Sequence, residues 1–220
     1  MRFSHFAVLI LPFLLIPACC GAQRVDVALV GGIPFVSDTK VTFAVPCSLP
    51  PSSCPPTAFT DHLQSTHSYF VGGSIAIRFL DRKTYALHLE VPAAAGVYSQ
   101  VLTLPTTPTF VSEMSSIFVT PSVRVKLLPD SVVSPWASAG GGLARYSPDP
   151  GVITNKGAIQ FGGGLDFKIG VQRLRLRAEA RDFLTGAPET ALVSGPFVGK
   201  PAGGFNRHNL YVGGGVLFRF

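Results

Sequence analysis

The residues of this chain that are capable of chemistry are few and widely separated. His67 stands beside Ser68, and His208 lies far along the chain from both. A histidine that converges with a serine and an acid supports acyl hydrolysis or acyl transfer, but no spacing here fixes an acid as the partner of either histidine. We therefore expect both histidines to lie in loops or at an interface, and we expect neither enzymatic activity nor a cofactor.

Two cysteines bracket a segment that is rich in proline and serine. They are Cys47 and Cys54, and in an oxidising compartment we expect a disulfide between them that closes the loop of residues 46–56. A second hypothesis adds His62 and His67 as ligands of a zinc ion. The irregular spacing of these four residues, with no fold signal around them, favours the disulfide.

The compartment is indicated by the first 22 residues, which have the parts of a secretory signal peptide. Arg2 is the charged start, residues 6–16 are an apolar core, and small residues precede a cleavage point after Ala22. The alternative is a lipoprotein-like site with Cys19 acylated, which Pro17 fits badly. We therefore expect a signal peptide at 1–22 and a mature domain at 23–220.

The composition of the chain is unusual for a soluble protein. Mean hydropathy is +0.38 and only 14% of the 220 residues are charged, well below the quarter that is typical of globular domains. Past residue 23 no apolar run approaches the length of a spanning helix, so any membrane insertion must use strands. The net charge of +6 indicates anionic lipid or sugar headgroups weakly, and we expect no nucleic-acid partner.

Alternation of apolar and polar residues predicts eight strands that would position all of these groups. The connections between them are alternately short and long, which in an up-and-down barrel places every short turn and both termini at one end. Glycine clusters recur in the strand middles, where small residues relieve crowding in a narrow barrel. The predicted strands span residues 24–32, 69–80, 83–91, 117–127, 134–146, 158–169, 173–184 and 209–220.

One face of these strands is apolar and the other is charged. Alternation alone does not say which face is inside, but the secretion signal, the loop pattern and the aromatic end of the chain favour lipid outside. Eight strands leave an interior that side chains fill, so the inward charges are expected to form a network of pairs. The expected members are Arg78, His88, Glu90, Arg124, Lys126, Asp166, Lys168, Arg175, Arg177, Glu179, Arg181 and Arg219.

Two strands fit this pattern poorly. Pro121 removes a ladder donor inside the fourth strand, which predicts a bulge or a later start. The inward parity of the fifth strand is ambiguous, because Trp136 and Tyr146 share one face as candidate interfacial aromatics whereas Leu143 favours the other face.

With this layout the chain resembles the small outer-membrane β-barrel family of the OmpA/OmpX type. The most specific motif is at the end of the chain, Gly215-x-x-Phe218-x-Phe220. The resemblance implies an eight-stranded antiparallel transmembrane barrel in the outer membrane of a Gram-negative-type bacterium, surrounded by its lipids and lipopolysaccharide. It also implies that Phe218 and Phe220 are read by the barrel-assembly machinery. Because the chain ends there, no peptidoglycan-binding domain is expected to follow.

Four functional hypotheses follow for such a chain. The first is a non-enzymatic barrel whose surface loops, above all the loop of residues 46–56, serve the envelope or adhesion to an unknown ligand. The second is a narrow channel or small-solute transporter with a basic lumen. The third is an enzyme that modifies lipid A through His67 with Ser68, or through His208. The fourth, a secreted soluble β-sandwich, requires the apolar face to be inside.

Overall fold

The computed structural model describes residues 24–44, 58–102, 110–149, 152–171, 173–188, 193–194, 197–201 and 205–220. Within these residues the chain forms one antiparallel sheet that closes on itself. The strands are Val25–Val36 (β1), Thr39–Ala44 (β2), Ala58–Asp81 (β3), Tyr85–Leu102 (β4), Phe110–Val119 (β5), Ser122–Leu127 (β6), Val133–Asp149 (β7), Thr154–Lys168 (β8), Leu174–Gly186 (β9), Val193–Ser194 (β10), Phe197–Pro201 (β11) and Phe205–Arg219 (β12).

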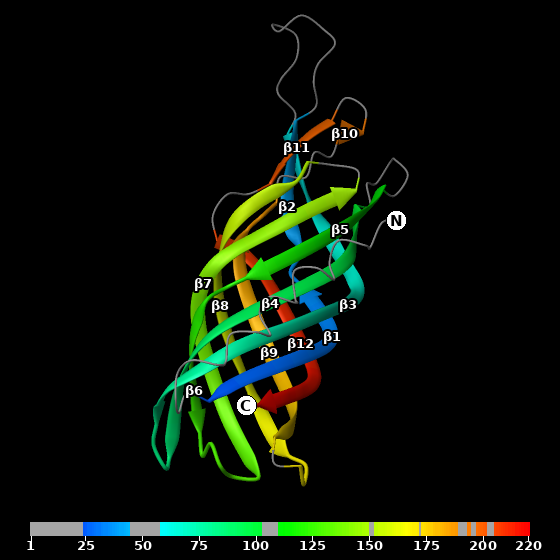
Figure 1. The fold of residues 1–220 in the computed structure, drawn as a ribbon. Coiled ribbons are helices and arrows are strands. Elements are labelled where there is room, and N and C mark those ends of the chain that lie inside the picture. The colour runs from blue at the N-terminus through cyan, green and yellow to red at the C-terminus, as the bar shows by residue number, and fades with distance from the viewer. Residues whose placement is uncertain are drawn as a thin grey trace, which may run out of the picture.

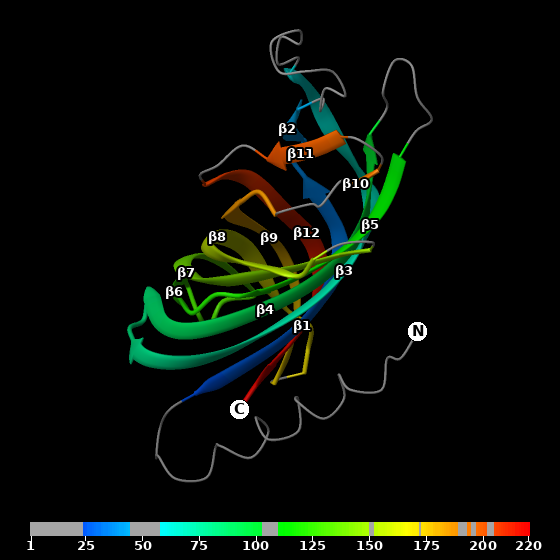
Figure 2. The same cartoon turned by 90° about the horizontal axis from the view of Figure 1, so that it is seen from above.

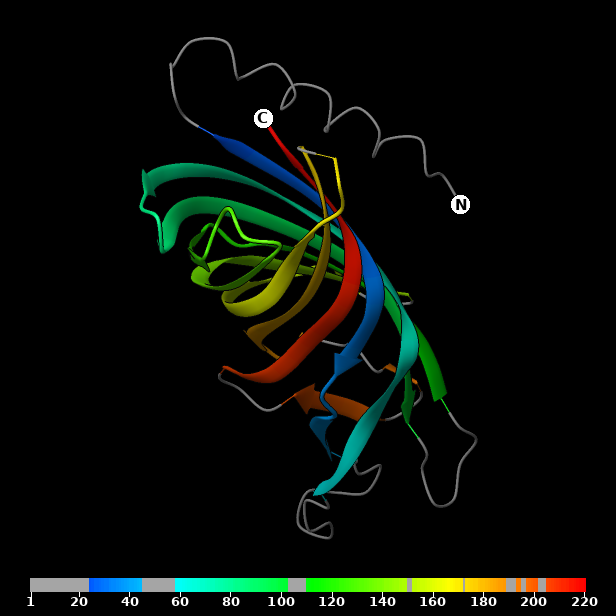
Figure 3. The same cartoon turned by 90° about the horizontal axis from the view of Figure 1, so that it is seen from below.

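The wall of the barrel has eight strand positions. They follow one another as β1, β3, β4, β5 with β6, β7, β8, β9 and β12, and β12 pairs with β1 to close the ring. Figure 3 looks into this ring from below. The closing seam runs from Asp26 opposite Arg219 to Val36 opposite Asn209. The predicted eight-stranded antiparallel barrel is thereby confirmed.

The ends of the barrel differ as the connection lengths predict. Three short turns, at residues 82–84, at 128–132 and between β8 and β9, lie at one end, which is at the bottom of Figure 1. At the other end the first half of β3 and the second half of β4 extend well beyond the predicted strands. There β2, β10 and β11 pair with one another and with β3 as an extension of the wall (Figures 1 and 2). These three strands lie in segments that the sequence pattern assigns to loops.

The fourth wall strand is interrupted at Pro121, as the missing donor of proline predicts. β5 ends at Val119 and β6 begins at Ser122, yet the pairing with β7 keeps its register, with Val119 opposite Leu143 and Ser122 opposite Gly140. The carbonyl of Pro121 still accepts a hydrogen bond from Gly141 N at 3.1 Å. The two segments therefore act as one strand with a local gap in its ladder.

Polarity is inverted relative to a soluble protein. Phe161 is 52% exposed on the outer wall, whereas Arg177 is 2% exposed in the interior. In β7, Trp136 and Tyr146 are both buried inside and Leu143 is 68% exposed outside. This settles the parity of that strand and corrects the expectation that Trp136 and Tyr146 are candidates for an interfacial belt. A soluble sandwich with an apolar interior is excluded by the same distribution.

The glycine clusters allow neighbouring strands to approach closely. A Cβ atom built on Gly215 would lie 1.8 Å from the carbonyl oxygen of Leu29 across the closing seam, and one on Gly142 would lie 2.1 Å from that of Val119. Real Cβ atoms do not approach backbone atoms so closely, so these positions accept only glycine without a shift of the backbone.

No helix within the described residues is long and apolar enough to cross a membrane.

Candidate functional site

The interior half nearest the short turns is built around three buried carboxylates. Glu90, on β4, is the most shared of them. Its Oε1 accepts hydrogen bonds from Arg181 Nη2 at 2.8 Å and from Arg124 Nη1 at 3.2 Å. Arg177 Nη1 lies 3.8 Å from the same oxygen. One carboxylate thus joins β4 to β6 and β9 across the lumen.

The other two carboxylates extend this network to the remaining sides of the barrel. Asp166, on β8, accepts two hydrogen bonds from Arg177, from Nε at 2.8 Å and from Nη2 at 3.0 Å, and it also pairs with Lys126. Asp26, on β1, accepts hydrogen bonds from Arg124 Nη2 at 3.0 Å and from Arg219 Nε at 3.3 Å. Bidentate and shared pairs of this kind compensate the cost of removing charges from water.

Trp136 provides an aromatic face for the same guanidinium groups. The Cζ atoms of Arg177, Arg181 and Arg124 lie 4.8, 4.9 and 5.8 Å from its ring centroid. Arginines within about 6 Å of an indole face are attracted to its quadrupole, more strongly where water is excluded. The tryptophan therefore holds mutually repelling cations together in the middle of the lumen.

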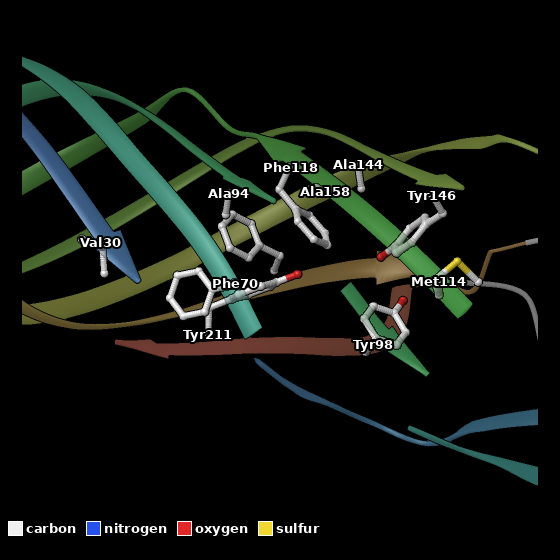
Figure 4. Close-up of a cluster of buried hydrophobic side chains, with 11 residues drawn as sticks. Val30, Phe70, Ala94, Tyr98, Met114, Phe118, Ala144, Tyr146, Ala158 and Tyr211 are labelled. Atoms are coloured by element: carbon white, nitrogen blue, oxygen red, sulfur yellow. The ribbon is translucent and has the colours of Figure 1, made fainter. Parts of the chain in front are cut away.

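The half of the interior nearest the loops is aromatic rather than charged. Phe118 stacks on Phe183 with centroids 4.6 Å apart, and Tyr211 meets both rings edge to face. Phe70 packs edge to face on Tyr211 at 4.8 Å. Figure 4 shows this cluster inside the barrel, with Tyr98, Met114 and Tyr146 on its loop side. We call Phe70, Phe118, Phe183 and Tyr211 the aromatic layer.

A single cation lies above the aromatic layer among the described interior residues. Arg207 Nη2 donates to the hydroxyl of Tyr98 at 3.0 Å, and its guanidinium lies over the rings of Tyr98 and Tyr146, 5.5 and 5.9 Å from their centroids. The hydroxyl of Tyr146 is bonded to Thr185 at 2.7 Å. The interior is thus filled from the short turns to the loops by paired or packed side chains.

The structure places most of the expected charged residues in this interior. Arg78, His88, Glu90, Arg124, Lys126, Asp166, Arg175, Arg177 and Arg181 are buried, while Glu179 and Arg219 are partly buried. Arg78 pairs with Asp81 at 2.8 Å, and Arg175 bonds Ser134 and the Pro129 carbonyl at the base of the barrel. Lys168 departs from the prediction, because β8 ends there and its side chain is exposed at the turn.

Some interior residues were missed by reasoning from the sequence. Asp26 lies on the inward face of β1 by alternation. It is the one charged residue in the interior of that predicted strand, so the alternation of charges that marks the other strands is absent there. The aromatic layer was missed because apolar residues were assigned to the outside. The available signal was parity: Phe183 lies two residues after Arg181, and Phe118 lies six before Arg124.

Other predicted positions lie outside the described residues or on the outer wall. Cys47 and Cys54 lie outside the described residues, as does the predicted signal peptide, and the side chains of His62 and His67 are not described. Phe218 and Phe220 lie exposed on the outer wall, and their role in assembly stays a prediction. Gly215 has in addition the packing role described above.

A closed antiparallel barrel with an apolar outside and a charged interior is the arrangement of a transmembrane β-barrel. In water such a surface would be unstable, whereas in a bilayer the closed ladder satisfies every spanning backbone group. Barrels of this kind with an even number of strands are those of bacterial outer membranes. The fold and its polarity therefore define the chain as a small outer-membrane barrel.

Comparison with known proteins agrees on the fold. No protein-family model and no curated protein matches the sequence. Among solved structures, the outer membrane protein OprG from Pseudomonas aeruginosa is similar with a TM-score of 0.52 at 8% identity, over 90% of this chain and 95% of that one. Neisserial surface protein A is similar with a TM-score of 0.44 at 16% identity, over 90% and 97%. The outer membrane protease OmpT from Escherichia coli gives 0.45 at 8%, over 90% and 97%.

Proposed function

We propose that this protein is a non-conducting outer-membrane barrel that displays its strand extension at the cell surface for interaction or adhesion. The strongest support is that side chains fill the lumen, whereas the wall extends beyond the barrel at the loop end. The lumen is filled by the charge network and the aromatic layer, while the wall continues past the barrel as β2, β10 and β11. Rigid scaffolds commonly carry binding function on such projecting segments.

The orientation follows from the layout of other outer-membrane barrels. Short turns face the periplasm and long connections face the outside, so the extension and the loop of residues 46–56 would be at the cell surface. The outer wall would contact the membrane lipids and lipopolysaccharide. We include in the proposal a signal peptide at 1–22, a disulfide between Cys47 and Cys54, and recognition of Phe218 and Phe220 by the barrel-assembly machinery.

A channel is the weaker alternative for this structure. The basic lumen that suggested it is occupied by arginines that are paired with Glu90, Asp166 and Asp26. The aromatic layer then lies between these charges and the loop end. A solute would have to displace both.

Surface display is tested with epitopes placed at the two ends. An epitope inserted between residues 50 and 51 is expected to bind antibody on intact cells, whereas the same epitope inserted between Arg82 and Lys83 is expected to bind only after the outer membrane is permeabilised. Both variants should keep heat-modifiable gel mobility, which reports the closed barrel. Labelling of the Arg82 variant on intact cells would contradict the orientation.

The interaction role is tested by removing the extension. In a variant with residues 39–63 replaced by a short glycine-serine turn, the barrel should still assemble. Cells that express it should lose binding to an array of glycans and extracellular matrix proteins relative to cells with the full chain. Equal binding of both cell types across the array, or no binding by either, would reject the adhesion role.

A further inference from the structure

A histidine and an aspartate form a pair on the outer wall of the barrel. His208 Nδ1 lies 2.6 Å from Asp182 Oδ2, between the neighbouring strands β12 and β9. The side chain of His208 is 58% exposed, so a carboxylate binds Nδ1 of an imidazole that is accessible from outside. A carboxylate in this position holds the tautomer and orientation that leave Nε2 available as a base.

A serine lies directly across from this histidine on the other neighbouring strand. Ser37 follows the last residue of β1, and its backbone N donates to the carbonyl of His208 at 2.9 Å. Its Oγ accepts a hydrogen bond from the backbone N of His208 at 3.0 Å. A hydroxyl that accepts in this way keeps its own proton free to donate. Residues that face each other across such a pair have Cβ atoms about 5 Å apart.

The surroundings of these three residues are apolar and face the lipid. The pairing register places Phe35 opposite Leu210, Leu210 opposite Asp182 and Asp182 opposite Phe161. Phe35, Leu210 and Phe161 are all exposed on the outer wall. Charged groups on this face are costly in the hydrocarbon core of a bilayer. We therefore expect the His208–Asp182 pair to lie near the lipid headgroups at the loop end. A lipid in the membrane therefore has direct access to it along this wall.

We propose that Ser37, His208 and Asp182 form an acyl-ester hydrolase site on the lipid-facing wall, with an ester-linked acyl lipid as substrate. This goes beyond surface display and replaces the expectation of a non-enzymatic protein. The sequence offers His208 for lipid chemistry without a partner, and the structure brings its partners from segments that are distant in sequence. The acyl chain of the substrate would lie along the apolar wall beside Phe35 and Leu210.

The reaction uses only water as co-reactant. After the Ser37 hydroxyl turns towards the imidazole, Oγ bonds to the ester carbonyl carbon as its proton passes to His208 Nε2. The carbon–oxygen bond to the alcohol then breaks, and the alkoxide takes that proton from Nε2. Water, deprotonated by His208, attacks the acyl-serine and releases the fatty acid, and the proton returns to Ser37. Asp182 stays ionised and orients the imidazole, which makes it a positioning residue.

Covalent labelling tests the nucleophile without knowledge of the natural lipid. The full chain, folded in detergent micelles, is treated with a fluorophosphonate probe and digested for mass spectrometry. We expect label on Ser37 and none on Ser115, an exposed serine of β5 that serves as the matched control. His208→Asn should abolish the label, because an asparagine amide can still donate to Asp182 but has no second nitrogen to act as base.

Turnover tests the substrate class. Release of fatty acid is measured from 4-nitrophenyl palmitate, from phosphatidylethanolamine vesicles and from purified lipid A. Ser37→Ala, and His208→Asn, which removes Nε2, should each lower the rate of fatty-acid release by roughly 100-fold or more, as expected for a nucleophile and its base. The comparison of vesicles with lipid A shows which acyl lipid is preferred. If Ser37 is unlabelled, and if the full chain cleaves none of the three substrates faster than Ser37→Ala does, the hydrolase is rejected. The His208–Asp182 pair then only links β9 to β12.

The effects of Asp182 substitutions on kcat and on KM distinguish a positioning role from a purely structural one. Asp182→Asn should lower kcat on 4-nitrophenyl palmitate while KM changes little, and Asp182→Glu should restore part of kcat. Heat-modifiable mobility reports folding of each variant. Equal kcat for the full chain and both variants would overturn the assignment of Asp182. The epitope and adhesion results are independent of all these outcomes, so the two proposals fail separately.

Discussion

Glu90 illustrates at the residue scale how this barrel tolerates a surplus of buried cations. It is fully buried and contacts three arginines, which come from β6 and β9. Each arginine has in addition the indole of Trp136 within 6 Å. Removing one member of such a network is more costly than never having built it, because the remaining charges stay buried with part of their compensation lost.

Glu90→Gln is therefore expected to destabilise the barrel by about 3 kcal/mol, since it leaves Arg124, Arg177 and Arg181 facing one another. The free energy of unfolding is measured by urea titration in detergent, with gel mobility as the readout. Glu113→Gln, at an exposed position, is the matched control and should change the free energy by less than about 0.5 kcal/mol. Equal effects of both substitutions would show that the network contributes little.

At the scale of the elements, the seam between β1 and β12 depends on close approach of two backbones. Gly215 faces Val30 across this seam, and the preceding glycine of the cluster, Gly214, faces Gly31. A Cβ on Gly215 would collide with Leu29 O, whereas one on Gly214 would reach only Arg177 O at 3.5 Å, an ordinary contact. The glycine of the terminal motif thus has a structural reason that is separate from recognition by any assembly factor.

Gly215→Ala is expected to impair closure and Gly214→Ala is not, although both lie in the same glycine cluster. The measurement is the yield of the compact, heat-modifiable form after refolding from urea into detergent, where no assembly machinery is present. We expect a yield for Gly215→Ala that is at least about fivefold lower, corresponding to a cost of about 1 kcal/mol or more. Equal yields would mean that the seam adjusts to the added methyl group.

The turn between β6 and β7 contains a residue with a strained backbone conformation. Leu128 has φ +45°, a left-handed conformation that costs a residue with a Cβ atom about 1 to 2 kcal/mol. Its carbonyl accepts hydrogen bonds from Ser131 N at 3.0 Å and from Ser134 Oγ at 2.8 Å, which hold the turn in place.

Leu128→Gly should accordingly raise the free energy of unfolding by about 1 kcal/mol, because glycine adopts positive φ without strain. Val132→Gly, an exposed position of the same turn with no positive φ, should be neutral or destabilising. Urea titration in detergent compares the two. A destabilised Leu128→Gly variant would show that the leucine side chain contributes more than its backbone strain costs.

The whole molecule consists of a closed wall around two interior layers of different chemistry. The charge network occupies the half near the short turns, and the aromatic layer occupies the half near the loops. The members of both layers are buried and contact one another across the lumen, which is the basis for expecting a barrel that does not conduct.

The full chain is expected to be electrically silent in planar bilayers. Replacing Phe118 and Phe183 together with alanine removes the stacked pair at the centre of the aromatic layer, and this variant too should stay silent, because the charge network still fills the other half of the lumen. Val123→Ala, on the outer wall, is the control for the substitution itself. Steady single-channel currents from the unmodified chain would contradict a filled lumen.

The amino-acid order alone settles the features that depend on neighbours within a few residues. Alternation identified eight wall strands and their apolar and charged faces, and Pro121 predicted the gap in the fourth one. Local pattern does not determine which inward side chains meet, because that depends on register and closure. Asp26 bonds Arg124 and His208 bonds Asp182 only once the sheet has closed into a ring. The same holds for the contacts within the aromatic layer, because parity places Phe118 and Phe183 on the inward face but does not show that their rings stack.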